Sequence, residues 1–318
     1  MTNIQRLARA ARSISRKWSH YSGVQRKPDL PEPRPLKLGV ALGGGFARGL
    51  AHIGVLKTLE EAGIPVDFVA GTSAGAIVGA CYCAGMSAAE VAEVARTARF
   101  RDFARWTLSR YGFCSNDRMT AFCDHVVKAS TFEELKVPLA IIATDFRTGG
   151  ATVFTKGTLS GPLRASCAYP GMFLPVEIDG RYYIDGMLAY GVPTTPLRQI
   201  GADRVLGVFL SSHWSQQRAP RHLFEVIGQC FSIAQARMSE LWKKDADLVL
   251  EPDVQGFGYD CFDRAQELIA LGAESMRAVL PELKMLLNPT FATNPLPGDI
   301  ASVPAPVPPA VAPSTLAV

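Results

Sequence analysis

The sequence has no apolar run long enough to cross a membrane. No stretch approaches the roughly 18 to 20 consecutive apolar residues that a membrane-spanning helix needs, and the N-terminus has no apolar block of the kind found in signal peptides. These absences predict an intracellular protein, either cytoplasmic or peripheral on the inner face of the membrane. With 318 residues, 48% of them hydrophobic and 19% charged, the chain can bury the core of one large domain.

The cysteines fit neither a disulfide framework nor a metal site. The seven cysteines are an odd number and contain no CxxC pair. Cys81 and Cys83 are two positions apart, so on a helix their side chains point about 200° apart and cannot bind one metal ion. We predict that all seven are reduced packing residues. Since no His, Asp or Glu cluster has ligand spacing either, we expect no metal and no other cofactor.

The two ends of the chain differ in composition from the middle. Residues 1–35 carry eight Arg and Lys against two acids, with apolar residues at helical spacing before a Pro-rich linker. We interpret them as a basic amphipathic leader, which either anchors the protein to anionic lipid or is simply solvated. Residues 288–318 are rich in Pro and Ala and are predicted to be disordered. Residues 36–287 are then the folded domain.

Within the folded domain, apolar runs of strand length alternate with longer segments of helical periodicity. This alternation predicts an α/β fold with a mostly parallel sheet that is covered by helices on both faces. A hairpin between 138 and 156 adds an antiparallel piece. The expected helices are 47–63, one beginning near Ser73, 117–128 and 221–244; the expected strands are 36–42, 66–72, 138–145, 151–156, 181–185, 204–211 and 247–252.

The segment VAGTSAGAIVG (69–79) places Ser73 where the second strand turns directly into a helix. Such a GxSxG turn forces the serine into a strained conformation and projects its hydroxyl beyond the sheet. Gly71 and Gly75 permit the turn, because side chains there would collide with the packed strand and helix. The serine also lies at a helix N-terminus, which favours negative charge nearby. The pattern indicates either a nucleophile or merely a tight packed turn.

The segment GGGFARG (43–49) ends the first strand and opens the first helix, so in a right-handed βαβ unit it lies beside Ser73. Its glycine N–H groups suit the oxyanion of an acyl transfer. A dinucleotide-binding loop is the competing interpretation, and it fails twice. Arg48 occupies the position of the required third glycine, and the second strand ends in AGTS rather than in an acid for a ribose.

A nucleophilic serine needs a base, and the sequence offers two arrangements. A triad of Ser73, Asp145 or Asp185, and His213 follows the chain order of α/β-hydrolases, although only two strands precede Ser73, fewer than that fold normally has. Alternatively, Asp185 ends a strand and is followed by Gly186, which leaves its carboxylate at the same C-terminal edge of the sheet as the serine. Burial would raise the pKa of such an aspartate enough for it to act as the base.

Six blocks, GGGFARGLAHIGVL, GTSAG, ATDFRTG, ASCAYPGMFLPV, YIDG and ADLVLEP, resemble bacterial patatin-like phospholipases in order and spacing over residues 36 to 255. The resemblance implies a three-layer α/β/α fold, a Ser–Asp dyad without histidine, and hydrolysis of acyl esters of lipids. By it, Ser73 is the nucleophile and Asp185 the general base of a catalytic domain at 36–287. The oxyanion loop would be Gly43, Gly44 and Gly45; the other motif positions are Phe46, Arg48, Gly49, Gly71, Gly75 and Gly186.

The sequence departs from the family pattern at two positions. Phe46 replaces a glycine of the family's GGGxRG loop, where its ring would narrow the site mouth or contact an acyl chain. Met187 follows Asp185 and Gly186 where the family has Gly or Ala, which affects local packing more than chemistry. We interpret Arg48 as a capping or salt-bridging residue rather than a phosphate contact. Residues 165–176 suit an acyl-pocket lining and a buried connection equally well.

We therefore predict a serine hydrolase of phospholipase A or lysophospholipase type. Its expected partners are a lipid or phospholipid substrate and, through residues 1–35, an anionic membrane surface; we expect no nucleic acid. Two alternatives remain open. One is a small-ester carboxylesterase with a Ser–Asp–His triad, and the other is a membrane-docked regulatory protein of patatin fold with weak hydrolysis.

Overall fold

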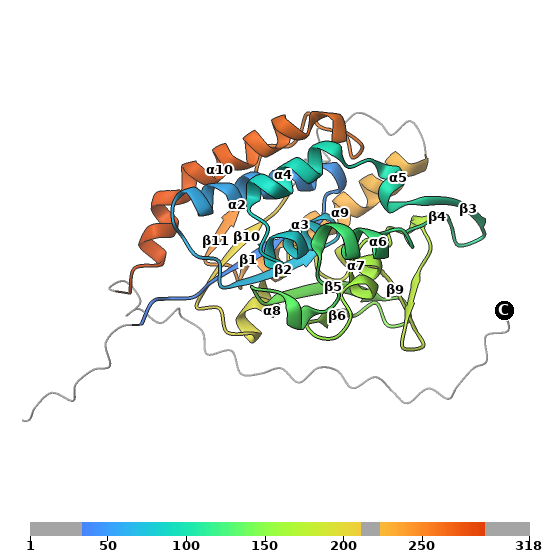
Figure 1. Cartoon of the computed structure of the whole chain (residues 1–318), viewed down its shortest axis with the longest axis horizontal. Helices are drawn as coiled ribbons and strands as arrows, with labels where there is room; N and C mark the ends of the chain where they lie inside the picture. Colours follow the sequence, from blue (N-terminus) through green and yellow to red (C-terminus); the bar gives the residue numbers. More distant parts are fainter. Residues whose placement is uncertain (1–33, 211–222, 290–318) are drawn as a thin grey trace, which may run out of the picture. The chain divides into compact units, whose positions relative to one another are not determined.

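A sheet of eight strands forms the centre of the fold in our computed structural model, which describes residues 34–210 and 223–289 (Figure 1). All of these except Arg34 belong to one compact unit that starts at Pro35. The predicted leader therefore lies outside the described residues apart from Arg34 and Pro35, and the predicted tail lies outside them after residue 289. The strand order is β11-β10-β1-β2-β5-β9-β8, with β6 paired to β5. The strands are β1 (Leu38–Leu42), β2 (Phe68–Thr72), β5 (Leu139–Asp145), β6 (Ala151–Phe154), β8 (Val176–Ile178), β9 (Arg181–Asp185), β10 (Arg204–Val208) and β11 (Leu248–Leu250).

The sheet is parallel from β11 through β10, β1 and β2 to β5. Strands β6 and β9 pair with β5 in the antiparallel sense, and β8 does the same with β9. The α/β class, the mostly parallel sheet and the hairpin of 138–156 are thus confirmed. Since parallel strands need covered crossover connections, helices lie on both faces.

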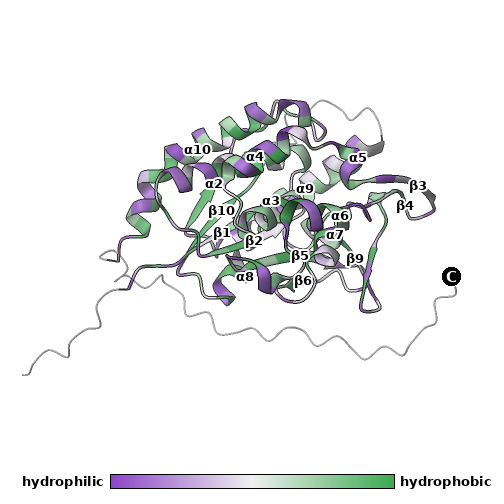
Figure 2. Ribbon diagram, in the orientation of Figure 1, coloured by the Kyte–Doolittle hydropathy of each residue, from purple (hydrophilic) through white to green (hydrophobic). Residues whose placement is uncertain are grey.

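Alternate side chains of the central strands point into two different apolar layers. Val40, Leu42 and Val69 belong to the larger core, whereas Ala41 and Ala70 belong to a smaller one on the opposite face. The first layer contains α2 (Ala51–Glu61), α3 (Ala74–Cys83), α4 (Ala88–Thr97) and α10 (Ala265–Leu286); the second contains α8 (Thr194–Gln199) and the end of α9 (Leu223–Lys243). Figure 2 shows hydrophobic colouring on the strands and hydrophilic residues on the outer helix surfaces.

Helices α2 and α10 pack unusually closely because glycines lie at their contact. A Cβ on Gly54 would come within 1.9 Å of the Ile269 carbonyl oxygen, and a Cβ on Gly272 within 1.9 Å of that of Ala51. Backbone therefore meets backbone at this crossing, and α10 is built into the first layer.

A second, small sheet lies beside the main one. It contains β3 (Arg105–Ser109), β4 (Gly112–Ser115) and β7 (Gly171–Phe173), in that order. The remaining short helical segments are η1 (Phe46–Leu50), α5 (Phe100–Phe103), α6 (Met119–Phe122), η2 (Cys123–Val127), η3 (Phe132–Glu134), α7 (Ser160–Ser166), η4 (Gly186–Leu188) and η6 (Phe262–Arg264). None of the helices that the structure describes is long and apolar enough to span a membrane.

Candidate active site

Ser73 lies in the one-residue turn between β2 and α3, with φ 54° and ψ −121°. Residues other than glycine rarely adopt a positive φ, so the Ser73 backbone is strained, as is common at functional sites. The flanking glycines make the turn possible. A Cβ on Gly75 would lie 2.2 Å from the Leu42 carbonyl oxygen, and one on Gly71 would lie 2.5 Å from the Ala76 Cα. The predicted strand-to-helix turn is therefore present, with the steric reason expected for both glycines.

Strand register brings Asp185 to the serine. Thr72, the last residue of β2, lies opposite Ile142 of β5, and Asp185, the last residue of β9, lies opposite the following residue, Ala143. Strands β2 and β9 thus end at neighbouring positions along β5, one parallel and the other antiparallel to it. Because β9 is antiparallel, Asp185 approaches Ser73 from the opposite direction and does not share a C-terminal sheet edge with it, contrary to our expectation.

The Ser73 Oγ donates a hydrogen bond of 2.9 Å to the Asp185 Oδ2. The other carboxylate oxygen, Oδ1, accepts the Met187 N–H at 2.9 Å, and the whole aspartate side chain is buried. Burial raises the pKa of Asp185 to about 7, although the Met187 and Ser73 hydrogen bonds oppose this shift. The arrangement can therefore transfer the serine proton to a carboxylate near neutral pH.

The glycine loop lies against the serine, but its three glycines differ in what their N–H groups do. The Gly43 N–H donates to the Val208 carbonyl at 3.1 Å, which continues the pairing of β1 with β10. Gly43 is therefore engaged and does not suit the predicted role of oxyanion donor. Among the described residues, no acceptor bonds the N–H of Gly44 or Gly45. Gly44 also lies close to the nucleophile, because a Cβ there would be 3.3 Å from the Ser73 Cβ.

Three residues at the site were not predicted individually from the sequence: Ser166, Cys167 and Ala74. The Ser73 N–H donates to the Ser166 Oγ at 2.8 Å, and Cys167 lines the pocket beside Ser73. Both belong to the segment 165–176 that we singled out, so the segment contributes to the site and is not only a connection. Ala74, the first residue of α3, has an N–H without an acceptor among the described residues, as expected at a helix N-terminus.

The remaining motif positions hold the loop in place. The buried Arg48 Nε donates to the Phe257 carbonyl at 2.9 Å, and the guanidinium lies 4.4 Å from the Tyr259 ring centre, so Arg48 anchors a distant loop. Its partners are a carbonyl and an aromatic ring, so among the described residues Arg48 forms neither the salt bridge nor the helix cap that we expected. Gly49 packs against Ala74, where a Cβ would approach to 2.5 Å.

Both departures from the family pattern lie at the site. Phe46 lines the pocket and makes an edge contact with Tyr169, with the ring centres 4.8 Å apart. The Met187 side chain covers Gly44, since a Cβ on this glycine would lie 2.4 Å from the Met187 Sδ. Gly186 fits against β5, where its Cβ would be 2.3 Å from the Ile142 carbonyl oxygen.

No histidine of the described chain bonds the Ser73 hydroxyl. His52 is buried, shares a 2.7 Å hydrogen bond with the Gly43 carbonyl, and has its pKa lowered to about 4 by burial. His125 bonds the Ala121 carbonyl at the surface. His213, the candidate triad member, lies outside the described residues. Asp145 instead forms an ion pair of 3.1 Å with Arg181.

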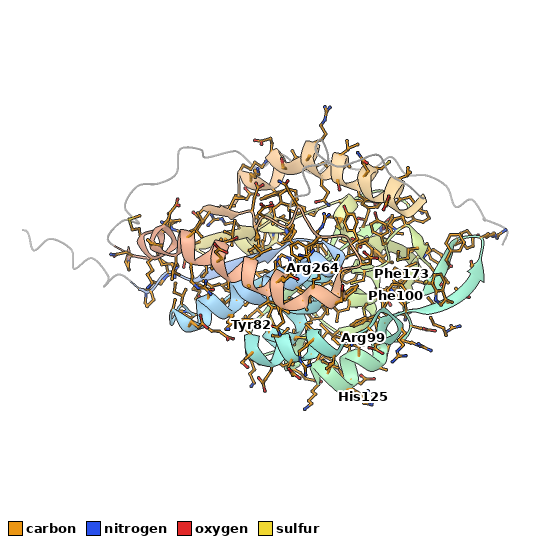
Figure 3. The ribbon with its side chains drawn as sticks, turned by 90° about the horizontal axis from the view of Figure 1, so that it is seen from above. Tyr82, Arg99, Phe100, His125, Phe173 and Arg264 are labelled. Carbon is orange, nitrogen blue, oxygen red and sulfur yellow. The ribbon has the colours of Figure 1, made fainter. Side chains whose placement is uncertain are left out.

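An apolar pocket that is partly open to solvent begins at Ser73. Ser73, Ile77 and Cys81 line it from one face of α3, so it extends about 12 Å along that helix at 1.5 Å per residue. Phe100 and Phe173 belong to its aromatic part, and Figure 3 shows these two side chains next to each other. In the described part of the chain, no three His, Cys, Asp or Glu side chains gather as a metal site would require.

Comparisons with known proteins agree with this architecture. A family profile for "Patatin-like phospholipase" matches residues 40–198. An uncharacterized NTE family protein of Mycobacterium tuberculosis is 34% identical over 178 residues, which are 55% of this chain and 49% of that protein. The neuropathy target esterase sws of Drosophila melanogaster is 31% identical over 183 residues, 55% of this chain and 13% of that protein.

The fold is also similar to the crystal structure of VipD from Legionella pneumophila. The TM-score is 0.52 at 12% identity, over 79% of this chain and 67% of VipD. The chain spans about half the length of the mycobacterial relative and less of the fly protein. The matched profile covers Ser73, Asp185 and the glycine loop. This chain belongs to the patatin-like phospholipase family.

Proposed function

We propose that the protein hydrolyses acyl esters of lipids, as a phospholipase A or lysophospholipase, with Ser73 as nucleophile and Asp185 as base. The observation that carries the proposal is the 2.9 Å hydrogen bond from the Ser73 Oγ to a buried carboxylate at the mouth of an apolar pocket. The fly relative is named an esterase, which supports the same bond type.

In the first half-reaction, Asp185 takes the Ser73 proton while the Oγ attacks the acyl carbonyl carbon. The N–H groups of Gly44, Gly45 and Ala74 have no acceptor among the described residues, and we assign the oxyanion to them. Each such donor typically lowers the barrier by about 2.7 to 4 kcal/mol. Protonated Asp185 then returns its proton to the leaving alkoxide, and an acyl-serine remains.

In the second half-reaction, Asp185 takes a proton from water as the water oxygen attacks the acyl carbon. The tetrahedral intermediate collapses, the Ser73 Oγ recovers the proton, and the free fatty acid leaves. The base must be ionised at the start of each half-reaction, which a pKa of about 7 allows near neutral pH. Asp185 needs no third residue to orient it, because the Met187 N–H holds its other oxygen.

The pocket supports a fatty acyl chain as the substrate's acyl part. Carbon–carbon bonds of about 1.5 Å at about 111° advance roughly 1.25 Å per carbon, so about 12 Å accommodates on the order of ten carbons. Each buried methylene contributes about 0.8 kcal/mol to binding. An acyl ester of a lipid therefore fits the pocket better than an acetyl or propionyl ester.

The direct test replaces the nucleophile. We expect Ser73→Ala to lower turnover of a p-nitrophenyl ester and release of fatty acid from phospholipid by at least about a thousandfold. Ser130→Ala, on an exposed loop serine, is the matched control and should keep wild-type turnover. Equal turnover by Ser73→Ala and wild type would overturn the assignment, and a weak wild-type activity would favour the regulatory alternative.

A further inference from the structure

The β3–β4 hairpin exposes aromatic side chains where a soluble surface normally has polar ones. Trp106 is 72% exposed and Tyr111 is 58% exposed. The two strands are joined by a two-residue turn, Arg110 and Tyr111, so these residues form the tip. Figure 1 shows the hairpin extending sideways from the layers that cover the sheet. Trp and Tyr, whose rings carry a polar group, are the aromatic residues enriched at membrane–water interfaces.

A row of neighbouring aromatic side chains connects the exposed Trp106 to the pocket. The ring centre of Phe100 lies 6.5 Å from that of Trp106 and 6.0 Å from that of Phe173. Phe100 and Phe173, which lie next to each other in Figure 3, belong to the pocket lining. Trp106 does not belong to that lining. Strand β4 also pairs with β7, which carries Phe173. A molecule bound at Trp106 would thus lie next to Phe100, which is part of the pocket wall.

The segment that contains the β3–β4 hairpin is strongly basic. Residues 96–118 contain six arginines against two aspartates. Arg105 forms an ion pair of 2.7 Å with Asp117, but Arg101 and Arg110 are exposed and pair with no acid among the described residues. The Arg110 guanidinium lies 4.9 Å from the Tyr111 ring centre, at the tip of the hairpin. Exposed guanidinium groups beside Trp and Tyr fit an anionic lipid surface.

We propose that the β3–β4 hairpin docks the protein on anionic phospholipid membranes and holds the pocket mouth at the lipid surface. Trp106 and Tyr111 insert as far as the boundary between headgroups and acyl chains, and Arg101 and Arg110 bind lipid phosphates. A second copy of the chain fits this surface less well, because it would bring an equally basic hairpin against it. The inference rests on the proposed function only in making lipid the substrate, since docking itself needs no hydrolysis.

The test measures vesicle binding by sedimentation, using the full chain in a Ser73→Ala background so that the vesicles stay intact. The vesicles are phosphatidylcholine with or without about 30% phosphatidylglycerol, a fraction that supplies the anionic surface. Arg110→Ala should weaken binding to the anionic vesicles about fivefold, and Trp106→Ala by a similar factor. Met285→Ala, which removes a 56% exposed side chain on α10, and Arg237→Ala on α9 are matched controls and should bind like the parent.

A second measurement locates the contact. Phospholipids with brominated acyl chains should quench tryptophan fluorescence of the parent more than that of Trp106→Phe, since bromine quenches only at contact. Unchanged binding by both hairpin variants, or equal quenching, would overturn the proposal. So would loss of binding only when Arg6, Arg9 and Arg12 of the leader are changed to Gln. A hairpin variant that alters the sedimentation coefficient without vesicles, and not vesicle binding, would identify a second copy as the partner instead.

Discussion

A buried aspartate can act as a base towards serine only if it is ionised and still basic. An ordinary carboxyl, with a pKa near 3.8, is too weak to take a serine proton at neutral pH. Burial raises the pKa of Asp185 to about 7, which strengthens the base while leaving much of it ionised at that pH. The Met187 N–H prevents a larger shift by stabilising the charged form. In the proposed dyad, one hydrogen bond and one buried position would replace the histidine of a triad.

This assignment predicts a pH–rate profile. Because protonated Asp185 cannot accept the serine proton, kcat/KM for a soluble ester should fall about tenfold per pH unit below pH 7 and should level off above it. An unshifted aspartate would instead give a flat profile from pH 5 to 8. Asp185→Asn should lose at least about a thousandfold in kcat/KM at every pH.

A histidine base would titrate in the same range, so the profile needs its own control. His213→Ala should keep both the inflection near pH 7 and the parent kcat/KM. Loss of the inflection in this variant would favour the Ser–Asp–His triad that we kept as the alternative. A flat profile of the parent between pH 5 and 8 would show that Asp185 does not have the raised pKa on which the dyad depends.

At the scale of elements, the sequence predicted those features whose signals lie in neighbouring residues. The turn at Ser73 and the strand ending at Asp185 both have short-range signals in glycines and apolar runs. Their meeting depends on the register of β2 and β9 along β5, which no local pattern contains. The engagement of the Gly43 N–H has the same origin, because its acceptor, Val208, lies on a strand far along the chain.

Helix α10 and the small sheet are among the elements that the sequence did not predict, and both omissions have an identifiable reason. Helix α10 contains Pro281 within its span, and a proline inside a periodic segment normally indicates a helix end. The small sheet combines β3 and β4 with the distant β7, and strands of three to five residues give weak signals. Residues in or next to both of these elements line the pocket. Phe173 comes from β7, and Phe262 directly precedes α10.

The run of pocket residues on α3 predicts how chain length is selected. Cys81 lies two helical turns beyond Ser73, about 12 Å along α3. Leucine at this position adds two heavy atoms to the pocket wall and displaces about two methylenes of a long acyl chain. At about 0.8 kcal/mol each, kcat/KM for a p-nitrophenyl palmitate should fall roughly fifteenfold in Cys81→Leu.

The corresponding butyrate ester ends before Cys81, so its turnover should stay near the parent value. Cys230→Leu, which changes an exposed cysteine, is the control and should leave both esters unaffected. An equal loss on both esters would indicate damage to Ser73 itself rather than a shortened pocket, and no loss on either would show that the acyl chain lies elsewhere.

At the scale of the whole molecule, the part that matches the family profile is smaller than the part that folds together. The profile ends at residue 198, before β10, α9, β11 and α10. Yet β10 pairs with all five residues of β1, and the Gly54–Ile269 contact joins α2 to α10. The glycine loop follows β1 directly, and the Gly43 N–H bonds β10. The candidate site therefore depends on residues that the profile does not include.

This dependence predicts that a fragment of residues 34–198 does not form the native fold. It would leave one edge of β1 unpaired and would expose apolar side chains of α2 and β1, such as Val40 and Ile53, that are buried in the native core. We expect the fragment to aggregate or to bind a hydrophobic dye without a cooperative thermal transition. A fragment of residues 34–289 is the control and should unfold cooperatively, because it keeps every described element. The short fragment could instead unfold cooperatively, with a midpoint temperature within a few degrees of that of the longer fragment. Residues 40–198 would then form a stable core without β10 and α10.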